Sequence, residues 1–398
     1  MNIKTILNYV LIVYLSVGCS INKQSNEGLP YIDVRKNYPE KEIVMTEIAD
    51  VTYLHLITKN SDYLYRGRII CITENTIVVG DDSSGSILFF SKDGQPISRL
   101  NRYGVGPEEY PMSRFSSIIY DEAKDDVFIR VFNNILVYSS SGVYKKKLTL
   151  PPGIYDVQIV SFDNQSLLVH DPKRIFEKMQ NKSIPKVSDF ITHYNDSSFF
   201  LISKADGKVL EYITMPSNEI DLSFYLYDGV IRMRPTYCRI VKCSEGLFLC
   251  NHEVDTVFLY GKDKSLTPVM RKIPLINKLD PMVILDNCMD TGKYQFIVTE
   301  TLSWEKDKDQ RKYYIRDKET GEIARQKIIL PDYQGKQLFI SPYNTYFNGG
   351  ETLSHFELDL IELKQAYNNN RLGGKLKELV VTLNEFEDNN VFMFFHFK

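Results

Sequence analysis

The sequence has almost no excess of charge of either sign. Its 398 residues include 48 lysine and arginine residues and 51 aspartate and glutamate residues, for a formal net charge of −3. A chain with so little net charge creates no broad positive field, and such a field is what draws nucleic acid to a protein surface. We therefore expect no nucleic acid among its partners.

Cysteine is also scarce. The chain has six cysteines, and Cys19 belongs to an N-terminal motif described below. The remaining five form an odd set, whereas an exported protein held together by disulfides is expected to have an even set at regular spacing. We interpret them as mainly small buried hydrophobic residues, with a single bridge within 238–288 as the alternative. The five are Cys71, Cys238, Cys243, Cys250 and Cys288.

Catalytic motifs are missing. The six histidines are scattered, and no Gly-x-Ser-x-Gly or His-Glu-x-x-His sequence occurs. The cysteines near His252 have spacings that fit no zinc motif. The acidic pairs at 81–82 and 125–126 fall in predicted turns, where aspartate is common for backbone reasons. The sequence thus predicts no catalytic residue, no metal site and no cofactor.

Tryptophan occurs once, but the chain contains 26 tyrosines and 22 phenylalanines. These two aromatic residues favour strands over helices. With 43% hydrophobic residues the chain can bury a large core, and all-β barrels and propellers often exceed the usual domain size as one unit. We therefore expect a single all-β domain.

The N-terminus has the layout of a signal peptide. Lys4 precedes an apolar run over residues 6–17 that ends just before Cys19. The run is too short for a permanent transmembrane helix, which needs about 20 residues. We therefore predict that residues 1–18 are a signal peptide and are removed.

The sequence Leu-Ser-Val-Gly-Cys-Ser at 15–20 resembles the lipobox of bacterial lipoproteins, in which the cysteine is lipidated and becomes the first residue. The pattern places an aliphatic residue three positions before the cysteine, where this chain has Ser16, so an ordinary signal peptide is the alternative. The resemblance implies lipidation at Cys19 and a membrane partner, with the protein anchored to the bacterial envelope at the outer membrane. The polar segment that follows predicts a lipidated flexible tether over 19–28.

A strand–turn–strand pattern repeats along the chain. Clear copies occur at 77–97, 127–144 and 246–263, and weaker copies at 198–210 and 312–323. Each copy has a strand, a polar turn, a second strand, a glycine-containing tight turn and a third strand, which is the meander of a propeller blade.

A ring of such sheets buries both faces of each blade. The repeats predict five blades between 70 and 330, and the chain ends can supply a sixth from strands within 43–57 and the run 391–397. That run is apolar or aromatic at every position except His396, so it is too hydrophobic for a free tail. We predict one six-bladed β-propeller over 29–398, closed by its N- and C-terminal strands.

Two regions depart from the repeat. Residues 171–190 are predicted to form an irregular insertion between blades. Residues 352–385 show leucines at helical spacing, which predicts a short helical decoration near the C-terminus.

The segment Gly-Val-Gly-Pro-Glu-Glu-Tyr at 104–110, together with the lipobox and the C-terminal strand, resembles the six-bladed β-propeller lipoproteins of Bacteroidetes. The resemblance covers essentially the whole mature chain. It implies a fold and an exported, membrane-anchored location, but no single activity, because related six-bladed folds include lactonases, lyases and peptide- or sugar-binding modules.

The same segment is not a dinucleotide-binding loop, because Glu109 stands where the third glycine is needed. We interpret Gly104, Gly106 and Pro107 as turn-building residues, the glycines supplying backbone conformations closed to other residues. The alternative is a loop that lines the central channel and contacts a ligand. Its candidate contacts are Arg102, Glu108 and Tyr110.

Two functions from different classes fit these observations. The preferred hypothesis is a non-catalytic binding or scaffolding propeller for a glycan, a peptide or an envelope protein, because catalytic motifs are missing while tyrosine and phenylalanine are abundant. The alternative is a hydrolase or lyase whose active site is assembled in the channel from several blades. Histidines or carboxylates gathered at one mouth of the channel favour the enzyme.

Overall fold

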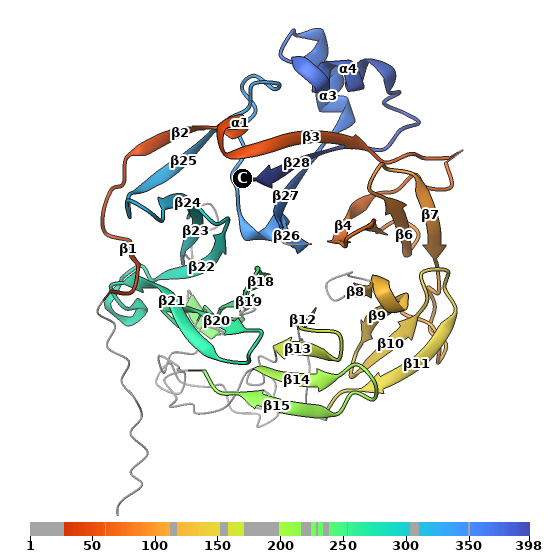
Figure 1. The fold of residues 1–398 in the computed structure, drawn as a ribbon, viewed down its shortest axis with the longest axis horizontal. Helices are drawn as coiled ribbons and strands as arrows, with labels where there is room; N and C mark the ends of the chain where they lie inside the picture. Colours follow the sequence, from red (N-terminus) through yellow and green to blue (C-terminus); the bar gives the residue numbers. More distant parts are fainter. Residues whose placement is uncertain are drawn as a thin grey trace, which may run out of the picture.

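The computed structural model places the strands in a ring around a central axis (Figure 1). The predicted signal peptide, the lipidation site Cys19, the insertion at 171–190 and Cys238 lie outside the residues that it describes. It describes residues 28–59, 61–111, 118–151, 158–170, 199–215, 224–227, 230–233, 239–252, 254–302, 310–348 and 351–398.

Six sheets form the blades, five of them at the predicted repeats and the sixth at the chain ends. Blade 1 consists of β4 (Gly67–Ile72), β5 (Thr76–Asp81), β6 (Ser86–Ser91) and β7 (Pro96–Leu100). Blade 2 consists of β8 (Ile118–Asp121), β9 (Asp126–Val131), β10 (Asn134–Tyr138) and β11 (Tyr144–Thr149). Blade 3 consists of β12 (Gln158–Ser161), β13 (Ser166–His170), β14 (Phe199–Ser203) and β15 (Val209–Ile213).

The next two blades are each extended by a strand from the N-terminal region. Blade 4 consists of β18 (Arg239–Lys242), β19 (Gly246–Cys250), β20 (Thr256–Gly261) and β21 (Leu266–Ile273), with β1 (Tyr31–Asp33) added in parallel to β21. Blade 5 consists of β22 (Val283–Asp290), β23 (Tyr294–Thr301), β24 (Gln310–Asp317) and β25 (Ile323–Ile329), with β2 (Glu40–Val44) added in parallel to β25. A separate hairpin is formed by β16 (Phe224–Tyr227) and β17 (Val230–Met233).

Blade 6 closes the ring with both ends of the chain. Its strands, in spatial order, are β26 (Thr345–Asn348), β27 (Glu351–Leu358), β28 (Val391–Phe397) and β3 (Ala49–His55). The C-terminal β28 therefore pairs with the N-terminal β3, as expected, and Phe395 lies opposite Val51 (Figure 1).

One part of the closure prediction is wrong. Ile43 lies in β2, which joins blade 5 instead of the closing blade. The short helix α1 (Met45–Ile48) separates β2 from β3 and carries the chain from one blade to the next. Only the later part of 43–57 therefore belongs to blade 6.

Neighbouring residues on one strand fill the core on opposite sides of a blade, because strand side chains alternate between faces. Phe89 points toward blade 2, where its ring centroid lies 5.1 Å from that of Tyr120. Phe90 points the other way, into a cluster with Phe392 of blade 6. Burying such a side chain contributes about 1.5–3 kcal/mol. The repeated apolar strands thus account for the ring.

The predicted turn at Asp93-Gly94 joins β6 to β7. Gly94 has a φ of 83°, and a Cβ there would overlap the carbonyl oxygen of His55 in blade 6. The backbone N–H of Ile57 donates a hydrogen bond of 3.0 Å to the Gly94 carbonyl oxygen. The glycine therefore permits both the turn and the close approach of blade 1 to blade 6.

Two short helices decorate blade 6 between β27 and β28. They are α3 (Leu360–Asn368) and α4 (Gly374–Thr382), and each buries one apolar face. Residues 352–358, predicted as helical, instead form most of β27, and the helix begins only after Asp359, whose side chain accepts a hydrogen bond from the Glu362 N–H. In the described part of the chain, the helices are too short or too polar to cross a membrane.

The described cysteines form no disulfide with one another. Cys243, Cys250 and Cys288 are buried, and Cys71 is partly exposed. Burial raises the pKa of the Cys288 thiol well above its usual value. These residues therefore pack as small hydrophobic side chains. The disulfide alternative is wrong for the pairings among Cys243, Cys250 and Cys288, and Cys238 lies outside the described residues.

Candidate functional site

The loop that follows β7 holds the residues predicted as ligand contacts. The side chain of Tyr110 is buried, and its hydroxyl donates a hydrogen bond of 2.8 Å to the Gly85 carbonyl oxygen. The Nε atom of Arg102 donates to the Gly142 carbonyl oxygen at 2.9 Å. The Glu108 side chain is exposed. The side chains of Tyr110 and Arg102 thus fasten the loop to blades 1 and 2, and the ligand contacts stay a prediction.

The turn-building role of this loop has a different physical basis from the one predicted. Gly104 and Gly106 both lack a left-handed backbone conformation. A Cβ at Gly104 would instead overlap the carboxylate of Glu109, which accepts a hydrogen bond of 2.9 Å from the Gly106 N–H. Pro107 lies exposed at the tip. The glycines thus leave room for the Glu109 side chain and do not supply unusual φ angles.

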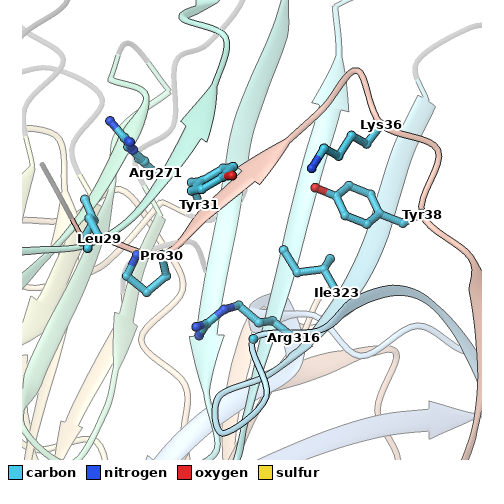
Figure 2. A pocket seen from close by; sticks show the side chains of 10 residues that line it. Leu29, Pro30, Tyr31, Lys36, Tyr38, Arg271, Arg316 and Ile323 are labelled. Carbon is cyan, nitrogen blue, oxygen red and sulfur yellow. The ribbon is translucent and has the colours of Figure 1, made fainter.

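A cavity of about 630 Å³ lies elsewhere, between blades 4 and 5. It exists because the N-terminal segment crosses from one blade to the other: β1 pairs with β21, and β2 pairs with β25. The crossing residues supply one wall, while β21, β24 and the start of β25 supply the others (Figure 2). Its principal polar and aromatic lining residues are Tyr31, Lys36, Tyr38, Arg271 and Arg316.

Two tyrosines give this cavity, which we call the crossing pocket, its aromatic surface. Tyr31 leaves 43% of its surface exposed, and the guanidinium of Arg271 lies 5.8 Å from its ring centroid. The Tyr38 hydroxyl accepts a hydrogen bond of 3.0 Å from the Asp33 N–H, and partial burial raises its pKa. Tyr31 is thus open to a ligand, while Tyr38 is held in place.

The charged residues of the crossing pocket are all cationic. Lys36, Arg271 and Arg316 line it, and its lining includes no aspartate or glutamate among the described residues. Arg316 donates through Nη1 to the amide oxygen of Gln295 at 3.4 Å. In the view of Figure 2, Lys36 and Tyr38 direct their polar ends toward Tyr31, whereas the guanidinium of Arg316 lies below Pro30 and that of Arg271 points away from Lys36 and Arg316. The arrangement suits an anionic group.

A second cavity, of about 800 Å³, lies beside blade 5. Its lining carries charges of both signs, and Lys327 lies 3.6 Å from Glu40 there. Its second lysine, Lys336, pairs with Glu362 at 2.7 Å. Because each lysine already has a carboxylate partner, this cavity shows no preference for a charged ligand.

A group of buried histidines and carboxylates lies where blades 3, 4 and 5 meet. His252 follows β19 and its Nε2 lies 2.8 Å from Oδ1 of Asp286, which lies within β22 and is fully buried. His170 ends β13, and burial followed by the nearby His252 lowers its pKa to about 3. In an antiparallel sheet, the end of the second strand and the start of the first lie at the same edge. These residues of blades 3, 4 and 5 therefore lie on the same side of the ring.

Arg311 extends this group. Its Nε lies 3.2 Å from the Glu300 carboxylate and 3.8 Å from Asp286 Oδ2. The described residues contain no cluster of three or more histidine, cysteine, aspartate or glutamate side chains arranged to hold a metal ion. The His252–Asp286 pair could hold or transfer a proton, and its partners position it.

Sequence reasoning missed both sites. The crossing pocket joins residues 31–38 to Arg271 and Arg316, which no spacing connects. The one sequence feature that could have indicated the crossing pocket is the mixture of aromatic and basic residues at 31–38, directly after the polar tether. The buried residues where blades 3, 4 and 5 meet are scattered in the same way, and the acidic and histidine positions carry no shared motif.

Comparison with known proteins agrees with the observed ring of six blades. A protein described as exported, from Bacteroides fragilis, is 16% identical, with a TM-score of 0.58 over 92% of this chain and 99% of that chain. A DUF4221 protein from Bacteroides vulgatus is 11% identical, with a TM-score of 0.46 over 88% and 97%. Virginiamycin B lyase from Staphylococcus aureus is 12% identical, with a TM-score of 0.36 over 76% and 94%.

At these identities the first likeness shows a shared fold, and the other two are too distant to add to it. No curated protein matches the sequence at a significant level. The family DUF5128, described as a 6-bladed beta-propeller, matches residues 20–343, which is most of the chain. The protein therefore belongs to this family of six-bladed β-propellers.

Proposed function

We propose that this protein is an exported envelope propeller that binds a ligand without converting it, and that the crossing pocket is the binding site. The observation that carries the proposal is the composition of that pocket. Its volume of about 630 Å³ lies within the usual range for small-ligand sites. Its lining offers aromatic faces and cations, and the described lining lacks a nucleophile paired with a base.

The proposed membrane anchor supports the same site. Residues 28 and 29 line the crossing pocket and directly follow the predicted tether. A tether over 19–28 reaches at most about 35 Å when fully extended. Lipidation at Cys19 would therefore hold the crossing pocket near the membrane surface, where it meets ligands of the envelope.

A glycan array probed with the protein that lacks residues 1–19 tests this proposal. We expect specific glycans to bind, and Tyr31→Ala to weaken that binding at least tenfold, because it removes the exposed ring. Tyr212→Ala, which truncates a similarly exposed tyrosine on blade 3, is the matched control and should bind as the unmodified protein does. Equal binding by both variants would place the ligand elsewhere.

A second function, a hydrolase or lyase, is favoured by the buried His252–Asp286 pair where blades 4 and 5 meet. A histidine positioned by a carboxylate is an arrangement that acid–base catalysis uses. An assay for newly formed reducing ends or unsaturated sugars, on any glycan that the array identifies, separates the two functions. Turnover that disappears in His252→Ala would establish the enzyme, and binding without turnover would exclude it for those glycans.

A further inference from the structure

The cations of the crossing pocket differ from the cations directly beside them in sequence. Arg35, next to Lys36, donates to Asp33 at 2.9 and 2.7 Å. Lys272, next to Arg271, lies 2.7 Å from Asp255. Lys318, two residues after Arg316, lies 2.8 Å from Asp290. Each neighbour has a carboxylate partner on the protein.

The three pocket cations form no such ion pair within the described part of the chain. The Nε of Arg271 is buried and lacks a hydrogen-bond partner there. Three cations that line one cavity repel one another. If these cations only stabilised the fold, we would expect each to pair with a carboxylate of the protein, as the neighbouring cations do. The missing negative charge is therefore expected to come from a ligand.

We infer that the crossing pocket binds an acidic saccharide, a sugar ring that carries a carboxylate. The inference rests on the proposed function and specifies its ligand. The Arg316 guanidinium binds the carboxylate, the Lys36 ammonium adds a positive charge on another side of the pocket, and the exposed face of Tyr31 packs against the sugar ring. The fork of arginine donors matches the planar carboxylate, and a tyrosine offers a flat apolar surface with a polar edge.

A carboxylate fits this site better than a phosphate does. Phosphate sites usually rely on several free backbone N–H groups at a helix N-terminus or a glycine-rich turn. In the crossing pocket the N–H of Gly321 already donates to the Asp317 carbonyl oxygen, and that of Arg271 donates to Pro30. The ligand is left with side-chain donors and an aromatic face.

Isothermal titration of the exported chain with a uronic acid disaccharide, the matching neutral disaccharide and inorganic phosphate tests the inference. We expect the uronic acid disaccharide to bind at least tenfold more tightly than the other two, and more weakly as salt is raised. Arg316→Gln and Lys36→Gln should each weaken it at least tenfold. Lys318→Gln removes the same charge beside the pocket and should leave the affinity within about twofold.

The outcomes separate the two proposals. The neutral disaccharide could bind as tightly as the uronic acid disaccharide, with an affinity that Arg316→Gln leaves unchanged and Tyr31→Ala abolishes. That result would overturn the acidic ligand but would leave the proposed binding function intact. Phosphate that binds as tightly as the disaccharide would overturn the saccharide. Glycan binding that no pocket variant changes would overturn both. Lys36 is exposed, so its variant is expected to fold even if Arg316→Gln does not.

Discussion

The ammonium of Lys272 lies 2.7 Å from the carboxylate of Asp255, and both side chains are almost fully buried. Burial lowers the pKa of Lys272, while the hydrogen bond to Asp255 raises it. The same carboxylate accepts a hydrogen bond of 2.9 Å from the Ile276 N–H. The pair therefore connects β21, the strand of blade 4 that pairs with β1, to the turn after β21 that contains Ile276.

We predict that Lys272→Met lowers the free energy of unfolding by about 3–5 kcal/mol, because it leaves the Asp255 charge buried without its partner. Urea denaturation followed by tyrosine fluorescence measures this. Lys327→Met removes an exposed lysine that pairs with Glu42 and should change stability little. A similar loss in both variants would mean that burial of the pair is not what matters.

Ring closure gives a second prediction. Phe395 is fully buried, pairs with Val51 and packs 5.4 Å from the Phe356 ring. Phe395→Ala should cost about 3–5 kcal/mol, whereas Phe386→Ala truncates an 80% exposed ring and should cost little.

Deletion of residues 390–398 is the stronger form of this experiment. It removes β28 and leaves β27 and β3 without a shared partner, and such open strand edges promote aggregation. We expect size-exclusion chromatography to show aggregates. A truncated chain that remains monomeric and melts at the same temperature would contradict closure of the ring by β28.

His355 predicts a dependence of stability on pH. Its ring is buried beside Tyr346 and its Nδ1 donates to the Asn344 carbonyl oxygen. Burial lowers its pKa to about 4. Because the folded pKa lies below the unfolded value of about 6.5, the unfolded state binds the proton first as the pH falls. The stabilisation is complete above about pH 6.5 and is lost progressively toward pH 4.

The expected loss from this one group is about 3 kcal/mol. Urea denaturation at several pH values between 7 and 4.5 should therefore show a smaller loss in His355→Gln than in the unmodified protein. Parallel curves for the two proteins would show that His355 does not titrate in this range.

The proposed anchor makes a simple prediction for cell fractionation. Cys19→Ala should move the protein from the membrane fraction to the soluble fraction and abolish incorporation of radiolabelled palmitate. Cys71→Ala, which changes a cysteine of the propeller body, should leave both unchanged. Palmitate that still enters Cys19→Ala would contradict lipidation at this residue.

The fold was predictable because its signals are local. Each blade has its own apolar strands and a turn such as Asp93-Gly94, and the hydrophobic run at 391–397 indicates a buried strand. The pairing of β2 could not be predicted from a local pattern, because its partner β25 lies far along the chain. Nothing in the sequence around Ile43 indicates a parallel pairing. The helical prediction for 352–358 was wrong because leucine spacing alone does not distinguish a strand from the helix that follows it.

The candidate site could not be predicted in the same way. Tyr31 and Arg316 meet only because the N-terminal segment crosses between blades, and His252 and Asp286 meet only because blades 4 and 5 are neighbours. Glu108 and Tyr110 were chosen from a conspicuous motif, yet the hydroxyl of Tyr110 serves the loop itself. In this protein the sequence motifs indicate turns. The candidate sites form only when the ring of blades closes, so no motif indicates them.

Hydrogen–deuterium exchange with and without the uronic acid disaccharide tests most directly whether the crossing pocket is the binding site. Ligand in this pocket should slow exchange in peptides that cover 29–38 and 314–323, which form its walls, and leave peptides around His252 and Asp286 unchanged. Slower exchange confined to peptides around His252 and Asp286, with 29–38 unaffected, would contradict the crossing pocket and place the ligand near that buried pair.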